Sequence, residues 1–157
     1  MSKLIAVLAA AAAILVIAAG CGGGSDSSSD SSSVTKAQFV KEADAICVKG
    51  DKQNEKEFEE FAKEHNLSEG KEPSKEVQEE AVQDLVVPGV RQQIEEIDDL
   101  AVPSGDEAKI EEVVSSVEEG LEELEEDPTL LFKGKNPLGK GSKLAREYGM
   151  VKCGSES

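Results

Sequence analysis

One apolar stripe constrains the fold of this chain more than any other feature of its sequence. Between Ser104 and Pro128, apolar residues recur at steps of three and four positions. They are Ile110, Val113, Val114, Val117, Leu121 and Leu124. This spacing is that of a helix face packed on a core, and Ser104 with Glu107 is a capping-box pair that would open the helix. Because the sequence lacks alternating runs rich in β-branched residues, the predicted fold class is all-α.

Two further long helices are predicted before this stripe. The first spans about 36–65, and Thr35 with Gln38 forms a capping box that satisfies free backbone donors at its start. The second covers about 74–100, and its apolar face is interrupted by Pro88. Because proline lacks an amide proton and clashes with the preceding turn, we expect a kink or a break there.

The C-terminal part is predicted to hold one short helix. Asn136 as cap and Pro137 at the first helical position would open this helix, and Gly149 would end it in a left-handed turn. Residues 129–135 are expected to form a loop whose apolar residues 130–132 tuck under the helices. With short connections, the simplest architecture is an up-down bundle of three long helices plus one short C-terminal helix, with one disulfide.

The first 20 residues have the pattern of a signal peptide. A positive start with Lys3 leads into an apolar run over residues 4–19, which is shorter than the roughly 20 residues of a membrane span but suits a signal core. The small residues 18–20 then precede Cys21, an order that resembles the bacterial lipobox, although Ala18 stands where leucine is usual. The pattern predicts that Cys21 is the lipidated N-terminus, and the alternative is an uncleaved membrane anchor.

A stretch of glycine, serine and aspartate follows over residues 22–33. It has no apolar side chain to bury, so we expect a disordered tether. The predicted organisation is a signal peptide over 1–20, lipidated cysteine and tether over 21–34, a helical bundle domain over 35–153 and a tail over 154–157. The expected location is the outer face of the cell membrane, and the formal charge of −16 argues against a nucleic-acid partner.

The sequence contains three cysteines. With Cys21 assigned to the anchor, Cys47 and Cys153 remain as one pair in an exported chain, where thiols oxidise. Two cysteines allow only one intramolecular pairing. A Cys47–Cys153 disulfide is therefore predicted.

Three short stretches carry a resemblance to known proteins. Residues 39–47 (FVKEADAIC) open the domain, residues 97–103 (IDDLAVP) join two helices, and residues 145–153 (AREYGMVKC) end it. Together they resemble a family of small exported helical lipoproteins of actinobacteria, over roughly residues 35–153. The resemblance implies an extracytoplasmic helical domain whose early and terminal cysteines pair, and it implies no particular activity.

Few residues suggest chemistry. His65 is the only histidine, and it is expected on the exposed surface because it lies near a helix end beside Lys63, Glu64 and Asn66. No nucleophile accompanies it, so a catalytic role is not predicted. Carboxylates crowd residues 118–127, but without the glycine turns of a calcium loop they predict a solvated helix face. Haem ligation would fall to His65, Tyr148 or Met150, none of which lies in a ligand-spaced pair. No catalytic residue, metal site or cofactor is predicted.

The Pro88 region leaves two outcomes open. With Ala43 and Gly50, Pro88 and Gly89 would border an apolar groove suited to a helix or an acyl chain, or the kink would pack densely. We expect a non-enzymatic binding or scaffolding module of the cell envelope, and the alternative is a carrier of a small apolar ligand, metal or haem. The partner would be an envelope protein or a small apolar ligand. The expected partner surface consists of Val87, Pro88, Gly89 and Val90.

Overall fold

The computed structural model describes residues 33–67 and 72–155, which belong to one compact unit, Ser31–Ser157. The predicted signal peptide, Cys21 and nearly all of the tether lie outside these residues and stay predictions. The described residues form helices and no strand, which confirms the all-α fold class. Within this part of the chain, no helix is both long and apolar enough to cross a membrane.

Helix α1 spans Lys36–Glu64 and begins with the predicted capping box. The Thr35 hydroxyl oxygen accepts a hydrogen bond from the Gln38 amide at 3.3 Å, and the Gln38 side chain accepts one from the Thr35 amide at 2.9 Å. Phe39, Ala43 and Cys47 are buried along its N-terminal half, whereas the C-terminal half contributes only Phe61 as a buried side chain. The two halves of α1 therefore differ in how far they enter the core.

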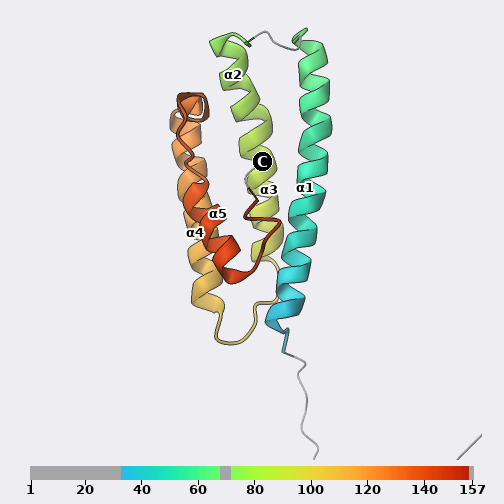
Figure 1. Cartoon of the computed structure of the whole chain (residues 1–157), viewed down its shortest axis with the longest axis vertical. Helices are drawn as coiled ribbons and strands as arrows, with labels where there is room; N and C mark the ends of the chain where they lie inside the picture. Colours follow the sequence, from blue (N-terminus) through green and yellow to red (C-terminus); the bar gives the residue numbers. More distant parts are fainter. Residues whose placement is uncertain (1–32, 68–71, 156–157) are drawn as a thin grey trace, which may run out of the picture. The chain divides into compact units, whose positions relative to one another are not determined.

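The second long helix continues through the proline without a break (Figure 1). It consists of α2 (Lys75–Ala81), the π-helical turn η1 (Val82–Val86) and α3 (Val87–Asp98). In the π turn the Val87 amide donates to the Val82 carbonyl, five residues earlier. The wider turn gives the Pro88 ring the room that a regular α-helical turn denies it. The irregularity predicted at Pro88 is therefore a local widening directly before the proline.

Helix α4 spans Glu107–Glu126 and buries the whole predicted stripe. The predicted capping box at its start is wrong, because Asp106 is the residue that precedes the helix and makes no side-chain capping bond. Gly105 has a left-handed φ of +89°, which turns the chain between Ser104 and the helix. The Glu107 carboxylate consequently accepts a hydrogen bond from the Gly105 amide at 2.7 Å instead.

The predicted loop after α4 contains a short 3-10 helix, η2 (Pro128–Lys133). Asp127 caps η2 by accepting a hydrogen bond from the Thr129 amide at 3.1 Å. Leu130 is buried as expected, but Phe132 is 51% exposed, so this part of the prediction is wrong. In a 3-10 helix, residues two positions apart point in different directions, which prevents both side chains from reaching the core.

The last helix, α5, spans Gly139–Tyr148 and begins two residues after the predicted start at Pro137. It ends as predicted, because Gly149 is left-handed with a φ of +118°. The amides of Gly149 and Met150 both return to the Ala145 carbonyl, at 3.1 and 2.9 Å. This turn carries the Met150 side chain back into the core, where it is fully buried.

Helix α3 lies between α1 and α4 and contacts both (Figure 1). Helix α5 packs against α4, while α1 packs mainly against α3 and η1. The segment after α5, residues 149–155, crosses from α5 to α1 (Figure 1). The largest fully buried side chains are Phe39, Val82, Leu121, Leu124 and Met150. The core thus joins all the helices. Helix α1 packs on α3 and helix α5 packs on α4, so α1 and α5 stand on either side of the surface that α3 and α4 form.

Candidate functional site

A groove of about 640 Å³ lies between α1 and α5. We call it the groove, and its base is formed by apolar residues of η1, α3 and α4. These base residues are Val86, Val90, Ile94, Ile97, Val113 and Val117. The volume falls within the roughly 300 to 1,000 Å³ of sites for small molecules, which are mostly apolar with few polar groups. The groove therefore has the size and the lining of a ligand site.

Two walls border this base. The wall from α1 consists of Cys47, Asp51, Asn54, Glu55 and Phe58. The opposite wall comes from α5 and the chain on either side of it, and includes Leu138, Gly141, Ser142, Ala145, Met150, Lys152 and Cys153. Phe58 is 40% exposed, so the groove offers an accessible aromatic ring on one wall. Apart from Gln93 of α3, its polar groups stand along the walls, and the rest of its base is apolar.

Glycines explain why α5 leaves this space open. A Cβ on Gly141 would lie 2.4 Å from Val117 Cγ2, and a Cβ on Gly120 would lie 2.6 Å from the Pro137 carbonyl oxygen. The backbones of α4 and α5 therefore approach each other more closely than larger residues would allow. Because α5 lies so close to α4, the space beside α1 is not filled by α5.

The four residues of the predicted partner surface lie in different surroundings, and their contact with a partner stays a prediction. Val87 is 5% exposed and belongs to the core, so it offers no surface to a partner. A Cβ on Gly89 would lie 2.3 Å from the Asn54 side chain, which shows dense packing of α1 on α3. Pro88 is exposed and does not line the groove, whereas Val90 lines it. Of the residues expected to border a groove, Ala43, Gly50, Pro88 and Gly89 do not line it, and Gly50 and Gly89 lie at the dense packing of α1 on α3.

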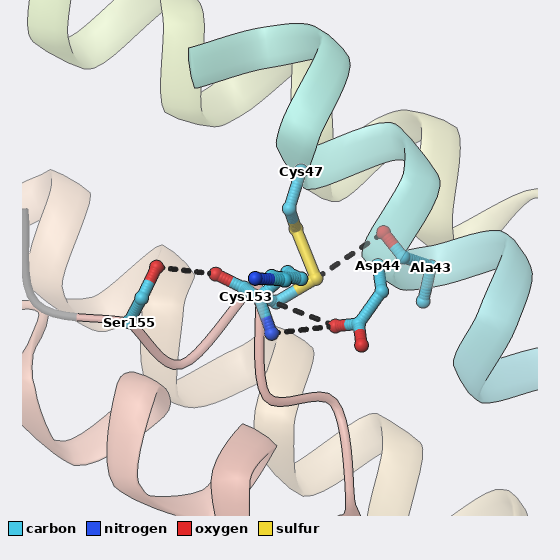
Figure 2. Close-up of a disulfide and its surroundings, with 6 residues drawn as sticks. Ala43, Asp44, Cys47, Cys153 and Ser155 are labelled. Atoms are coloured by element: carbon cyan, nitrogen blue, oxygen red, sulfur yellow. Dashed lines mark hydrogen bonds between the residues drawn. A yellow bond between two sulfur atoms is a disulfide. The ribbon is translucent and has the colours of Figure 1, made fainter.

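The predicted disulfide is confirmed and lies at the groove. Cys47 and Cys153 are 106 residues apart in sequence, and their Cα atoms are 5.1 Å apart (Figure 2). Beside it, the Asp44 carboxylate accepts hydrogen bonds from the Lys152 amide at 2.8 Å and the Cys153 amide at 3.3 Å (Figure 2). Residues 149–155 are thus fastened to α1 by one covalent bond and two hydrogen bonds.

The same segment is also fastened to α5. The Arg146 guanidinium donates a hydrogen bond to the Gly154 carbonyl at 2.6 Å. A Cβ on Gly154 would lie 2.3 Å from Arg146 Cγ and 2.5 Å from the Ser142 carbonyl oxygen, so the contact is close. Residues 149–155, which we call the closing segment, therefore bridge the two walls of the groove.

Charge is distributed unevenly along the groove. Asp51 and Glu55 lie one helical turn apart on α1, which places them on one face. Within residues 33–67 and 72–155, neither carboxylate has an ion-pair partner. Lys152 is the one basic residue among those that line the groove. The wall from α1 is therefore anionic and open to a cationic group.

The acidic stretch 118–127 lies elsewhere and is partly neutralised. Glu119 pairs with Lys140 at 3.2 Å, and Glu125 pairs with Arg91 at 2.6 Å. Asp127 accepts hydrogen bonds from Thr129 and Lys133, which lower the pKa of this carboxyl to about 2. In the described part of the chain, no group of three or more His, Cys, Asp or Glu side chains could hold a metal ion. Three carboxylates of this stretch thus take part in ion pairs or hydrogen bonds with neighbouring residues.

The residues considered for haem each have structural contacts. His65 is half-buried rather than exposed as expected, because its ring stacks on Phe61 with 4.1 Å between centroids. The Tyr148 hydroxyl donates to the Asp106 carboxylate at 3.0 Å. Burial, with this hydrogen bond, raises the pKa of Tyr148 to about 12. Neither ring lines the groove, which Met150 alone of the three reaches.

Comparison with known proteins adds no further assignment. No family model matches the chain, and neither a curated protein nor a solved structure does. The candidate site therefore rests on the chemistry and geometry of this chain alone.

Proposed function

We propose that this protein is a lipid-anchored, extracytoplasmic binding module of the cell envelope that holds the alkyl chain of a small amphiphile and catalyses no reaction. The observation that carries the proposal is the groove, with its apolar base and its volume of about 640 Å³. Membrane attachment through Cys21 rests on the N-terminal sequence pattern. The resemblance to exported lipoproteins of actinobacteria supports the same location, and the helices are proposed to follow an up-down order.

An alkyl chain suits the groove better than a compact polar molecule does. Val86, Val90 and Ile94 follow one another at steps of four residues along η1 and α3, so they form an apolar row parallel to the helix axis. Each methylene group removed from water contributes about 0.8 kcal/mol. Because about 1.4 kcal/mol is a tenfold change in affinity, two added methylenes should tighten binding by about tenfold until the groove is full.

The wall from α1 favours a cationic head group on this chain. Asp51 and Glu55 are exposed carboxylates beside the apolar base, and the whole chain carries a formal charge of −16. An anionic head group would be repelled by both, whereas an ammonium group would be attracted. The proposed ligand class is therefore a single-chain cationic amphiphile.

The binding test uses the absence of tryptophan from the sequence. Phe58→Trp places a reporter in the groove, and Phe132→Trp is the matched control, since Phe132 is 51% exposed and does not line the groove. Both are made in the exported full chain with Cys21→Ser and titrated with dodecylammonium, dodecanol and dodecanoate below their micelle concentrations. We expect the tryptophan emission to shift to shorter wavelength in Phe58→Trp alone. Affinity should be highest for dodecylammonium, lower for dodecanol and lowest for dodecanoate.

Two outcomes would overturn this assignment. If none of the three ligands changes the emission of Phe58→Trp, the groove does not bind alkyl chains. If Phe132→Trp responds equally, the ligands adsorb without using the groove. A folded helix of another protein or a second copy of this chain would instead appear as a complex in native mass spectrometry of the unliganded protein.

The anchoring proposal has a separate test. Metabolic labelling of producing cells with a fatty-acid analogue should mark the wild-type protein and leave Cys21→Ser unlabelled, because only the thiol of Cys21 lies in the lipobox-like pattern. Equal labelling of the two proteins would rule out lipidation at Cys21.

A further inference from the structure

The disulfide is part of the groove as well as a crosslink of the fold. Both Cys47 and Cys153 line the groove, one on each wall. Cys47 is nearly fully buried, whereas Cys153 is half-buried. A ligand that fills this end of the groove would therefore lie against the bond and limit access to it.

The closing segment depends on this bond for its attachment to α1. Reduction would leave the hydrogen bonds from the amides of Lys152 and Cys153 to Asp44, and the Cys153 thiol could then donate to the Ala43 carbonyl oxygen, which lies 3.3 Å from its sulfur. The attachment to α5 would persist, because the Arg146 bond to Gly154 and the buried Met150 side chain do not involve the disulfide. Reduction would thus remove the covalent attachment of the segment to α1 and leave weaker hydrogen bonds there, while the segment stays on α5.

Release at this position changes the groove directly. Lys152 and Cys153 both line it, so their displacement from α1 removes the contact that joins the two walls. Helix α1 keeps its packing on α3 and η1, which leaves the apolar base in place. The expected result is a wider groove that encloses an alkyl chain less completely.

We propose that ligand binding in the groove is coupled to the redox state of the Cys47–Cys153 disulfide, an inference that rests on the proposed function. A thiol reductant attacks the more exposed Cys153 sulfur, Cys47 leaves as a thiolate and takes up a proton, and a second thiol frees Cys153. In sum, two reductant thiols become one disulfide, and the protein gains two electrons and two protons. The oxidised form binds tightly and the reduced form binds weakly.

Thermodynamic linkage makes the coupling reciprocal. If reduction weakens ligand binding by a given factor, bound ligand must make reduction harder by the same factor. Two independent readouts therefore report one quantity. The first is the dissociation constant of the ligand, and the second is the ratio of reduced to oxidised dithiothreitol at which half of the protein is reduced.

The experiment uses the full exported chain with Cys21→Ser and Phe58→Trp, and dodecylammonium as the probe. We expect the dissociation constant to rise about tenfold on reduction, within the range usual for coupled sites, and saturating probe to shift the reduction midpoint by the same factor. The double variant Cys47→Ser with Cys153→Ser should bind the probe as weakly as the reduced protein does. Its dissociation constant should not change when dithiothreitol is added. Circular dichroism checks that every form is folded.

The outcomes separate this inference from the proposed function. Equal dissociation constants for folded oxidised and reduced protein would overturn the coupling and leave the groove as the binding site. Absence of binding in both states would overturn both proposals. If reduction unfolds the chain, the coupling is overturned as well, because loss of binding then reports unfolding of the domain and not release of the closing segment from α1.

Discussion

The two halves of α1 have the same secondary structure and opposite roles. In the N-terminal half, Phe39, Ala43 and Cys47 recur every four residues and are buried. In the C-terminal half, residues 51–57 are polar or charged, and Phe58, which follows them, is 40% exposed. The first half builds the core and carries the disulfide. The second half stands beside the apolar row of α3 without covering it, and so forms a wall of the groove.

This difference shows how an open apolar surface can arise in a stable helical domain. The apolar row of η1 and α3 continues through Val86 and Val90. The part of α1 opposite this row, residues 51–57, has no apolar side chains. Apolar surface that has no apolar partner on a neighbouring helix stays accessible, and such surfaces often mark binding sites. The N-terminal half of α1 thus contributes mainly to stability, and the C-terminal half contributes mainly to the proposed binding.

Removing the disulfide should have the largest effect on stability. Its cysteines are 106 residues apart, and the chain-entropy model assigns about 4 to 5 kcal/mol to the closure of so long a loop. Urea unfolding of the double variant Cys47→Ala with Cys153→Ala should show a loss of about this size. A loss below about 1 kcal/mol would mean that the N-terminal half of α1 does not need its covalent attachment.

Alanine at one phenylalanine in each half should separate their roles. Phe39→Ala removes a fully buried ring and should lower the free energy of unfolding by about 3 to 5 kcal/mol. Phe58→Ala removes a ring that is 40% exposed and should change it by about 0.5 kcal/mol, while weakening alkyl-chain binding. Similar stability losses for the two variants in urea unfolding would contradict the comparison.

A smaller effect is expected at Tyr148, whose ring packs edge-on against Phe39 with 6.0 Å between centroids. Tyr148→Phe removes the hydrogen bond to Asp106 and should cost about 1 kcal/mol at neutral pH. Because the pKa of Tyr148 is raised from 10.0 to about 12 in the folded state, its contribution is complete below pH 10 and is lost as pH rises toward 12. The wild type and Tyr148→Phe are compared between pH 10 and 12. A constant difference in their free energies of unfolding would refute the role given to the Tyr148 hydroxyl.

The smallest effect is expected outside both halves, where Asp127 provides a control. Its pKa is lowered from 3.8 to about 2 in the folded state, so its contribution is present above pH 3.8 and is lost as pH falls toward 2. The stability advantage of the wild type over Asp127→Asn should shrink across this interval in acid unfolding. Asp127→Asn should leave ligand binding at neutral pH unchanged, and weaker binding would show that the groove is not a local site.

Local rules predicted much of this fold from the sequence. The stripe from Ile110 to Leu124, the capping box at Thr35 and the left-handed Gly149 each follow from short-range chemistry that neighbouring residues determine. The capping box at Ser104 failed because Gly105 turns the chain there, a competing local preference that the spacing alone does not reveal. The burial of Val87 next to an exposed Pro88 depends on the π turn, which shifts the face that each later residue presents.

The groove itself was only partly predictable. The groove lies close to Pro88, as its lining by Val90 shows, but the residues expected to border it do not line it, and Gly89 packs on Asn54. The second wall comes from α5 and the closing segment, which follow the Pro88 region only after the whole of α4 and η2. The small residues Gly141 and Ala145 were a signal for close packing of α5, but nothing in the sequence says which helix receives them.

The most direct test of the account maps where an alkyl chain binds. A dodecylammonium analogue with a diazirine near the end of its chain would be photolysed with the full exported Cys21→Ser protein, and the labelled peptides sequenced by mass spectrometry. We expect labels on the base and walls of the groove, at Val90, Ile94 and Ala145, and excess unlabelled probe should abolish this labelling. Labels confined to exposed apolar residues outside the groove, such as Phe132 and Val151, would contradict it.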